Sequence, residues 1–153
     1  MNTKLLTTLS IFVLALMVLV SCNEDDDFSA PAITDLEIGH ENSKVGYPGS
    51  ELHIEAMIVA EGRIDQIVVE IHPEGNHHHK SGQGTDNGHQ EWDFEYIWTE
   101  FNGLLNTTFH EHIEIPLEAG LGHYHFHLQV IDMQGKTTVL ETEFEVKEPQ
   151  EGN

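Results

Sequence analysis

The sequence predicts an all-β fold, an antiparallel β-sandwich of about seven strands. Apolar and polar side chains alternate along seven short segments, which is typical of strands with one face in a core and the other in water. Gly, Pro, Asn and Asp lie between these segments, as expected for turns. No segment of the domain repeats its apolar residues with a helical period, so we expect no helical layer.

Each predicted strand follows from this alternation. In the second strand, for example, Leu52 and Ile54 share one face while His53 lies on the other. In the fourth, the aromatic side chains share one face, which indicates core packing. In chain order, the predicted strands cover residues 33–38, 51–60, 64–72, 92–98, 108–115, 123–132 and 138–146.

Two details favour one kind of sandwich. Gly120-Leu121-Gly122-His123-Tyr124 resembles the tyrosine corner of immunoglobulin-like domains, in which the Tyr hydroxyl returns to the backbone upstream. Residues 132–136 (Asp-Met-Gln-Gly-Lys) predict a tight turn into the last strand. We therefore expect immunoglobulin-like topology, the alternative being another antiparallel β-domain.

The N-terminus predicts export. Lys4 is followed by an almost wholly apolar run over residues 5–20. This run is shorter than a typical transmembrane helix and has the length of the apolar region of a signal peptide. Leu19-Val20-Ser21-Cys22 resembles a bacterial lipobox, which implies removal of residues 1–21 and a lipid on Cys22. The alternative is an uncleaved anchor helix with an incidental Cys.

An acidic tether is expected over residues 22–32. Its Asn-Glu-Asp-Asp-Asp run at 23–27 is physically a solvated linker. It also resembles the export signal of Bacteroidota surface lipoproteins, which implies an outer-membrane location facing the cell surface. We expect the sandwich to occupy residues 33–148, with a His-rich loop at 73–91 and a polar tail at 149–153.

The charge of the domain excludes some partners. Lys4 is the only charged residue among 1–21, so the remaining 132 residues hold five basic and 27 acidic side chains, a net charge of −22 with neutral His. Such a surface repels nucleic acid and attracts cations. Cys22 is the only cysteine, so neither disulfides nor thiolate metal ligands are expected in the domain.

The twelve His residues are clustered in the sequence. His110-Glu111-His112 and the alternating His at 123, 125 and 127 lie on predicted strands. On a strand, residues i and i+2 point the same way, about 6.5–7 Å apart. Two such imidazoles can converge on one metal ion at about 2.0–2.1 Å from each nitrogen.

Immunoglobulin-like topology predicts which His residues meet. The third strand would pair with the sixth, bringing His72 towards His123 and His125, with Glu70 beside them. The second strand would pair with the fifth, so that His53 and Glu55 face His110 and His112. Imidazole and carboxylate ligands suit Zn(II), our first choice, and also Cu(II) or Ni(II). Whether the two patches form one site depends on strand order.

A family resemblance covers most of the domain, from about Asp35 to Val146. It rests on Leu52-His53-Ile54-Glu55-Ala56, Val69-Glu70-Ile71-His72, Phe109-His110-Glu111-His112-Ile113-Glu114-Ile115-Pro116 and Tyr124-His125-Phe126-His127-Leu128. These motifs resemble an uncharacterised Bacteroidota lipoprotein family, domain of unknown function 4625. The resemblance implies a lipid-anchored immunoglobulin-like domain without an established activity. It favours His53, His72, His110, His112, His125 and His127 as metal ligands, and leaves His123, Glu70, Glu55, His77, His78 and His79 as further candidates.

Two binding functions are expected, and no enzymatic one. The sequence contains no Gly-x-Ser-x-Gly, His-Glu-x-x-His or phosphate-binding loop, and no Cys nucleophile in the domain. The first hypothesis is capture or buffering of a divalent metal, with an outer-membrane importer or a surface protein as partner. The alternative is an adhesive or accessory domain that binds protein or glycan, with Trp92, Tyr96 or Trp98 as candidate contacts. Titration of twelve His would take its charge from −22 towards −10 below about pH 6.5.

Overall fold

The computed structural model describes residues 28–74 and 90–149. This part contains eight strands and one short 3-10 turn, η2 (His40–Asn42). None of its helical segments has the length and hydrophobicity needed to span a bilayer. The predicted signal peptide, Cys22, the acidic run at 23–27, His77, His78, His79 and His89, and residues 150–153 lie outside the described residues.

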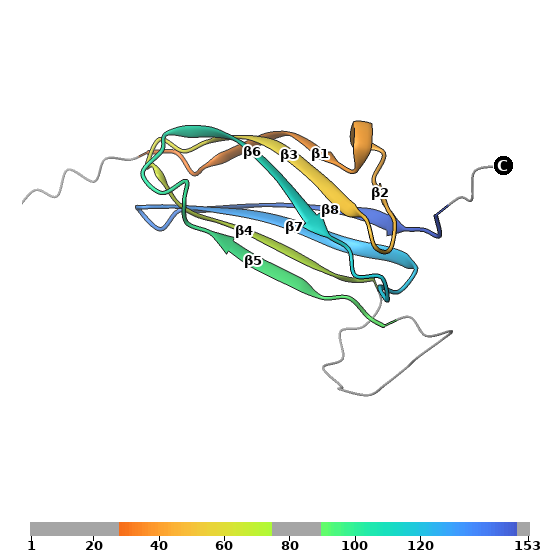
Figure 1. The fold of residues 1–153 in the computed structure, drawn as a ribbon. Coiled ribbons are helices and arrows are strands. Elements are labelled where there is room, and N and C mark those ends of the chain that lie inside the picture. Colours follow the sequence, from red (N-terminus) through yellow and green to blue (C-terminus); the bar gives the residue numbers. More distant parts are fainter. Residues whose placement is uncertain (1–27, 75–89, 150–153) are drawn as a thin grey trace, which may run out of the picture.

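The strands form two sheets that pack face to face (Figure 1). One sheet has the order β1 (Ala32–Ile38), β3 (Glu51–Val59), β6 (Asn106–Glu114). The other has the order β2 (Val45–Gly46), β8 (Thr137–Val146), β7 (Gly122–Asp132), β4 (Ile64–Pro73), β5 (Phe94–Trp98). All pairs are antiparallel except β2 with β8. The predicted sandwich and both predicted pairings, β4 with β7 and β3 with β6, are confirmed.

The core is made by alternate residues of each strand. In β7, Phe126, Leu128 and Val130 are fully buried, and in β3 the same holds for Leu52 and Ile54. Burial of one such side chain contributes about 1.5–3 kcal/mol. Because strand side chains alternate, the residues between these apolar positions lie on the outer faces. This alternation carries the His residues of β3, β6 and β7 to the surface.

The tyrosine corner is present. The Tyr124 hydroxyl donates a hydrogen bond of 2.8 Å to the carbonyl of Gly120. Burial raises the pKa of Tyr124 above its usual value. A Cβ at Gly120 would lie 3.3 Å from both the Tyr124 hydroxyl and the Gln90 carbonyl, so the close approach favours glycine there. This contact supports the immunoglobulin-like assignment.

The predicted turn between β7 and β8 is built around Asp132. One of its carboxylate oxygens accepts the backbone N–H of Gln134 at 2.9 Å and that of Lys136 at 2.8 Å. Gly135 adopts φ 80°, a conformation that favours glycine. The short connection sets the register of β7 against β8, and this register places His123, His125 and His127 opposite Glu residues.

Four details differ from the sequence prediction, the first being the short strand β2, which was not predicted. β5 begins at Phe94, two residues later than expected, although Trp92 and Trp98 are core residues as the shared face indicated. Tyr96 is 52% exposed because β5 is an edge strand. Residues 28–31 already pack on the domain: Ser29 donates to the Glu61 carboxylate, and Thr138 donates to the carbonyl of Pro31. The part of the expected tether that the structure describes is therefore held against the sandwich.

Candidate metal centre

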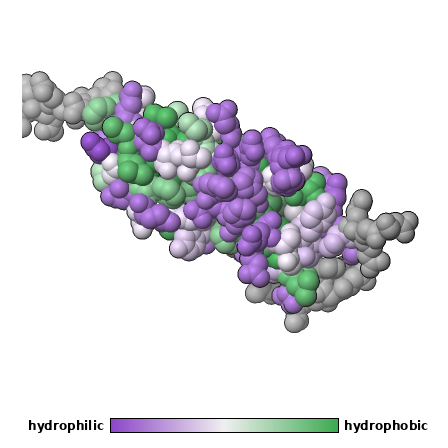
Figure 2. Space-filling view, turned by 45° about the horizontal axis from the view of Figure 1, so that its top comes forward, coloured by the Kyte–Doolittle hydropathy of each residue, from purple (hydrophilic) through white to green (hydrophobic). Residues whose placement is uncertain are grey.

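The outer face of the three-stranded sheet carries a cluster of three imidazoles. β3 and β6 pair so that His53 lies directly opposite His112, and Glu55 opposite His110. All four side chains therefore project from the same face, where they are partly exposed. Figure 2 shows a band of hydrophilic side chains across the middle of the molecule on the side turned forward, with hydrophobic ones nearer the end at which the described chain begins.

The three rings are close enough to share one ion. His53 lies with its ring centroid 4.9 Å from that of His110 and 5.2 Å from that of His112. One ligating nitrogen from each of the three lies within 4.8 Å of the other two. The Nε2 atoms of His110 and His112 are 3.3 Å apart. Two nitrogens bound to one tetrahedral Zn(II) at about 2.0–2.1 Å would be separated by about 3.3 Å. We call His53, His110 and His112 the imidazole cluster.

Carboxylates lie behind two of these rings. Nδ1 of His110 is 3.8 Å from a carboxylate oxygen of Glu55, and Nδ1 of His112 is 3.5 Å from one of Glu51. In a neutral imidazole whose proton is on Nδ1, facing the carboxylate, the Nε2 atom is unprotonated and has a lone pair for a ligand. With one Nε2 protonated the two rings can share a hydrogen bond at 3.3 Å, and with both Nε2 atoms unprotonated they can bind a cation between them. Metal-bound His residues in proteins commonly have such carboxylate partners.

The outer face of the five-stranded sheet carries a second His patch. The ring of His72 lies 5.1 Å from that of His125 and 5.2 Å from that of His127, but the latter two are 6.5 Å apart. Nδ1 of His125 and of His127 each lie 3.7 Å from a carboxylate oxygen, of Glu143 and Glu141 respectively. Nδ1 of His72 lies 3.4 Å from the carbonyl of Pro73. This patch repeats the pattern of the imidazole cluster with looser convergence.

One sequence expectation for this patch needs correction. His123 was expected beside His72, but the register places His72 opposite His125, and the ring contacts of His72 are with His125 and His127. His123 lies instead with Glu74 and Glu143. Glu70 lies beside this patch as expected, opposite His127 on an exposed part of β4, although within the described ranges it forms no ion pair with an imidazole.

The His residues form two separate patches and not a single site. They lie on the outer faces of different sheets, and packed sheets are about 10 Å apart, so no ion could bridge them. The three nitrogens converge in the imidazole cluster, whereas the rings of His125 and His127 in the second patch are 6.5 Å apart. His40 belongs to neither patch; its side chain is 93% exposed and its Nε2 lies 3.8 Å from a carboxylate oxygen of Glu41.

Comparison with known proteins identifies the family. The model of a family described as Domain of unknown function (DUF4625) matches residues 20–147, more than four-fifths of the chain. This chain belongs to the DUF4625 family. No curated protein matches it. Among solved structures, the soluble domain of PmoD from Methylocystis sp. ATCC 49242 (Rockwell) is similar at a TM-score of 0.36 and 11% identity, covering 76% of this chain and 90% of that one. A likeness at this level bears on no functional question.

The six His residues that the DUF4625 resemblance favoured divide evenly between the two faces. His53, His110 and His112 form the imidazole cluster, and His72, His125 and His127 form the second patch. The resemblance thus named both groups without indicating that they are separate.

Sequence reasoning missed four carboxylates, namely Glu51, Glu74, Glu141 and Glu143. A signal for two of them was available. The outward Glu residues at 141, 143 and 145 repeat the spacing of the His residues at 123, 125 and 127. The tight turn after Asp132 pairs the two runs residue by residue, so each His faces a Glu across the strands. Glu51 and Glu74 lie beside His only because of register that the spacing does not specify.

Proposed function

We propose that this DUF4625 domain binds a divalent transition metal, Zn(II) in the first place, at the imidazole cluster. The observation that supports this most strongly is the pair of Nε2 atoms 3.3 Å apart, each on a ring whose Nδ1 faces a carboxylate. His53, placed opposite His112, supplies the third nitrogen. Three nitrogen ligands leave one tetrahedral position open.

The open, exposed position suits reversible binding better than permanent storage. Side chains of His110 and His112 are 51% and 48% exposed, so an ion there can be reached by solvent and by a competing ligand. Structural zinc sites are closed by four protein ligands. We therefore propose capture or buffering of the metal without catalysis, followed by release to an importer or a surface protein. Cu(II) and Ni(II) would also suit imidazole nitrogens.

The second His patch is proposed as a weaker site for the same class of metal. Its three rings have oxygen partners on Nδ1, which leaves Nε2 for a ligand. Its wider separation, 6.5 Å between His125 and His127, requires side-chain rotation before three nitrogens can converge.

Location is proposed from the sequence. We propose that residues 1–21 are removed and that Cys22 receives a lipid, which anchors the domain to the outer membrane facing the cell surface. Five residues separate Cys22 from Phe28, where the described chain begins. At about 3.3–3.6 Å per residue, such a spacer would keep the near end of the domain within about 20 Å of the bilayer.

The test is zinc-dependent stability of the chain from residue 22, with Cys22→Ser to prevent oxidation. A ligand at 100 times its Kd stabilises the native state by about 2.7 kcal/mol. For a domain of this size that corresponds to a Tm rise of about 10 °C. His112→Ala should remove most of this rise, and the matched control His40→Ala, an exposed His outside both patches, should keep it. An equal rise in His112→Ala and His40→Ala would reject the imidazole cluster as the site.

One observation supports the alternative function, an adhesive or accessory domain. Tyr96 and Ile97 on the edge strand β5 are 52% and 45% exposed, whereas Trp92 and Trp98 are buried and unable to contact a partner. Exposed aromatic side chains are common anchors of protein or glycan interfaces. Under this alternative, Tyr96→Ala would reduce attachment of the protein to its surface partner while zinc-dependent stability stayed unchanged.

A further inference from the structure

A third group of ligating side chains lies at the end of the five-stranded sheet, away from the imidazole cluster. It consists of Glu74, His123 and Glu143, each of which offers one ligating atom within 4.8 Å of the other two. We propose that these three residues form a separate site for a harder divalent cation, of which Mn(II) is the representative. This proposal does not depend on zinc binding at the imidazole cluster, because the two groups share no residue.

Backbone pairing positions the three side chains. Glu143 lies on β8 opposite His125, and Glu145 opposite His123, so Glu143 is diagonal to His123 on the same outer face. Glu74 directly follows β4, and its backbone N–H donates a hydrogen bond of 2.9 Å to the carbonyl of His123. This bond extends the β4–β7 pairing beyond Pro73 and holds Glu74 beside the first residues of β7.

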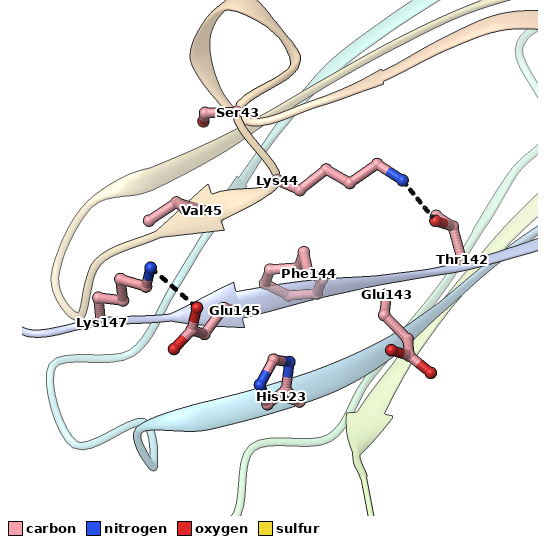
Figure 3. Close-up of a pocket in the computed structure, with 9 residues that line it drawn as sticks. All are labelled: Ser43, Lys44, Val45, His123, Thr142, Glu143, Phe144, Glu145 and Lys147. Atoms are coloured by element: carbon pink, nitrogen blue, oxygen red, sulfur yellow. Dashed lines mark hydrogen bonds and ion pairs between the residues drawn. The ribbon is translucent and has the colours of Figure 1, made fainter.

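His123 and Glu143 line an open hollow of about 550 Å³ between β7, β8 and the segment before β2 (Figure 3). Two lysines also line it, but each has another partner. Lys147 Nζ lies 2.9 Å from a carboxylate oxygen of Glu145, and Lys44 Nζ donates to the Thr142 hydroxyl at 2.9 Å. Within the described residues neither lysine forms an ion pair with Glu143, so neither neutralises the two carboxylates of the proposed site. Glu143 also lies 3.7 Å from Nδ1 of His125, so the proposed site borders the second His patch.

The donor set distinguishes this site from the two His patches. Two carboxylates and one imidazole supply two oxygen donors and one nitrogen, with a formal charge of −2 when His123 is neutral. Carboxylate oxygen and water suit Mn(II), whereas imidazole suits Zn(II), Cu(II) and Ni(II). The exposed position leaves room for water in the remaining places of an octahedron. We expect Mn(II) here and zinc at the imidazole cluster.

Paramagnetic broadening can locate the ion. Mn(II) is added well below stoichiometry to the ¹⁵N-labelled chain from residue 22 with Cys22→Ser, and amide signals are followed by NMR. The proposal predicts that broadening centres on the amides of Glu74, His123 and Glu143. Glu74→Gln and His123→Ala should each weaken Mn(II) binding by about tenfold or more. Removal of a residue that only contacts a metal ligand already lowers metal affinity by about 10–100-fold, and a direct ligand should matter at least as much.

The matched control is Glu100→Gln, which removes one exposed carboxylate from the β5–β6 connection outside the proposed site. It measures how much of the affinity comes from the net negative charge alone. Broadening spread over the acidic surface, or an equal loss in Glu100→Gln, Glu74→Gln and His123→Ala, would overturn the proposal. His112→Ala should change zinc binding and leave Mn(II) broadening in place, so failure of one site is distinguishable from failure of the other. Circular dichroism of each exposed-site variant confirms that it is folded.

Discussion

The carboxylates behind the imidazole cluster should strengthen zinc binding without touching the ion. Glu51→Gln and Glu55→Gln keep the size of each side chain and remove its charge, at 3.5 Å from His112 Nδ1 and 3.8 Å from His110 Nδ1. When zinc binds Nε2, positive charge develops on the ring, and the facing carboxylate stabilises it.

The size of the effect follows from distance and exposure. Two unit charges about 4 Å apart in water interact by about 1 kcal/mol, and exposed pairs measure about 0.2–1 kcal/mol. The side chains of Glu51 and Glu55 are 71% and 43% exposed, so the upper end of that range applies to neither in full. We expect each variant to weaken zinc binding by about twofold to threefold, and the double variant by about fourfold to ninefold if the two effects add.

Competition with a chromophoric zinc chelator measures these changes, and Glu37→Gln is the control. Glu37 is an exposed carboxylate of the same face, on β1 opposite Glu55. Its removal reports the general loss of negative charge. If Glu51→Gln and Glu55→Gln weaken binding no more than Glu37→Gln does, the carboxylates do not act through the rings and the reasoning is refuted.

Three further predictions concern the fold and the anchor. Tyr124→Phe should lower stability by about 1 kcal/mol through loss of the hydrogen bond to Gly120, measured by urea denaturation. Burial raises the pKa of Tyr124, so its contribution is present below about pH 10 and is lost as pH rises through the folded-state pKa; Tyr124→Phe should show less alkaline loss of Tm. Asp132→Ala should cost about 2 kcal/mol, because the N–H groups of Gln134 and Lys136 lose their acceptor, and an unchanged urea midpoint would contradict this. Cys22→Ala in the full chain should move the protein from the membrane fraction to the soluble fraction of the expressing cell, and continued membrane retention would favour an uncleaved anchor helix.

The sequence was informative wherever period-two alternation coincided with burial. Phe126 and Leu128 alternate with His125 and His127, so both the core face and the outer face of β7 could be predicted. Tyr124 was recognisable because the residues that precede it, Gly120 to His123, are typical of the tyrosine corner.

The rest depends on register, which alternation does not determine. A shift of two residues keeps every side chain on its own face but changes its partner across the strands. For this reason His72 was expected to meet His123 as well as His125, whereas the register pairs it with His125 and its second ring contact is with His127. The same limit applies to Glu51, whose contact with His112 is diagonal across β3 and β6 and is not visible in the spacing of either strand.

The most direct test of metal binding at the imidazole cluster is a crystal structure of the zinc-soaked domain with anomalous data at the zinc edge. We predict an anomalous peak between His110 Nε2 and His112 Nε2, about 2.0–2.1 Å from each, with a nitrogen of His53 as third ligand. Full occupancy of zinc elsewhere on the domain, with His110 and His112 still facing each other unbound, would contradict it.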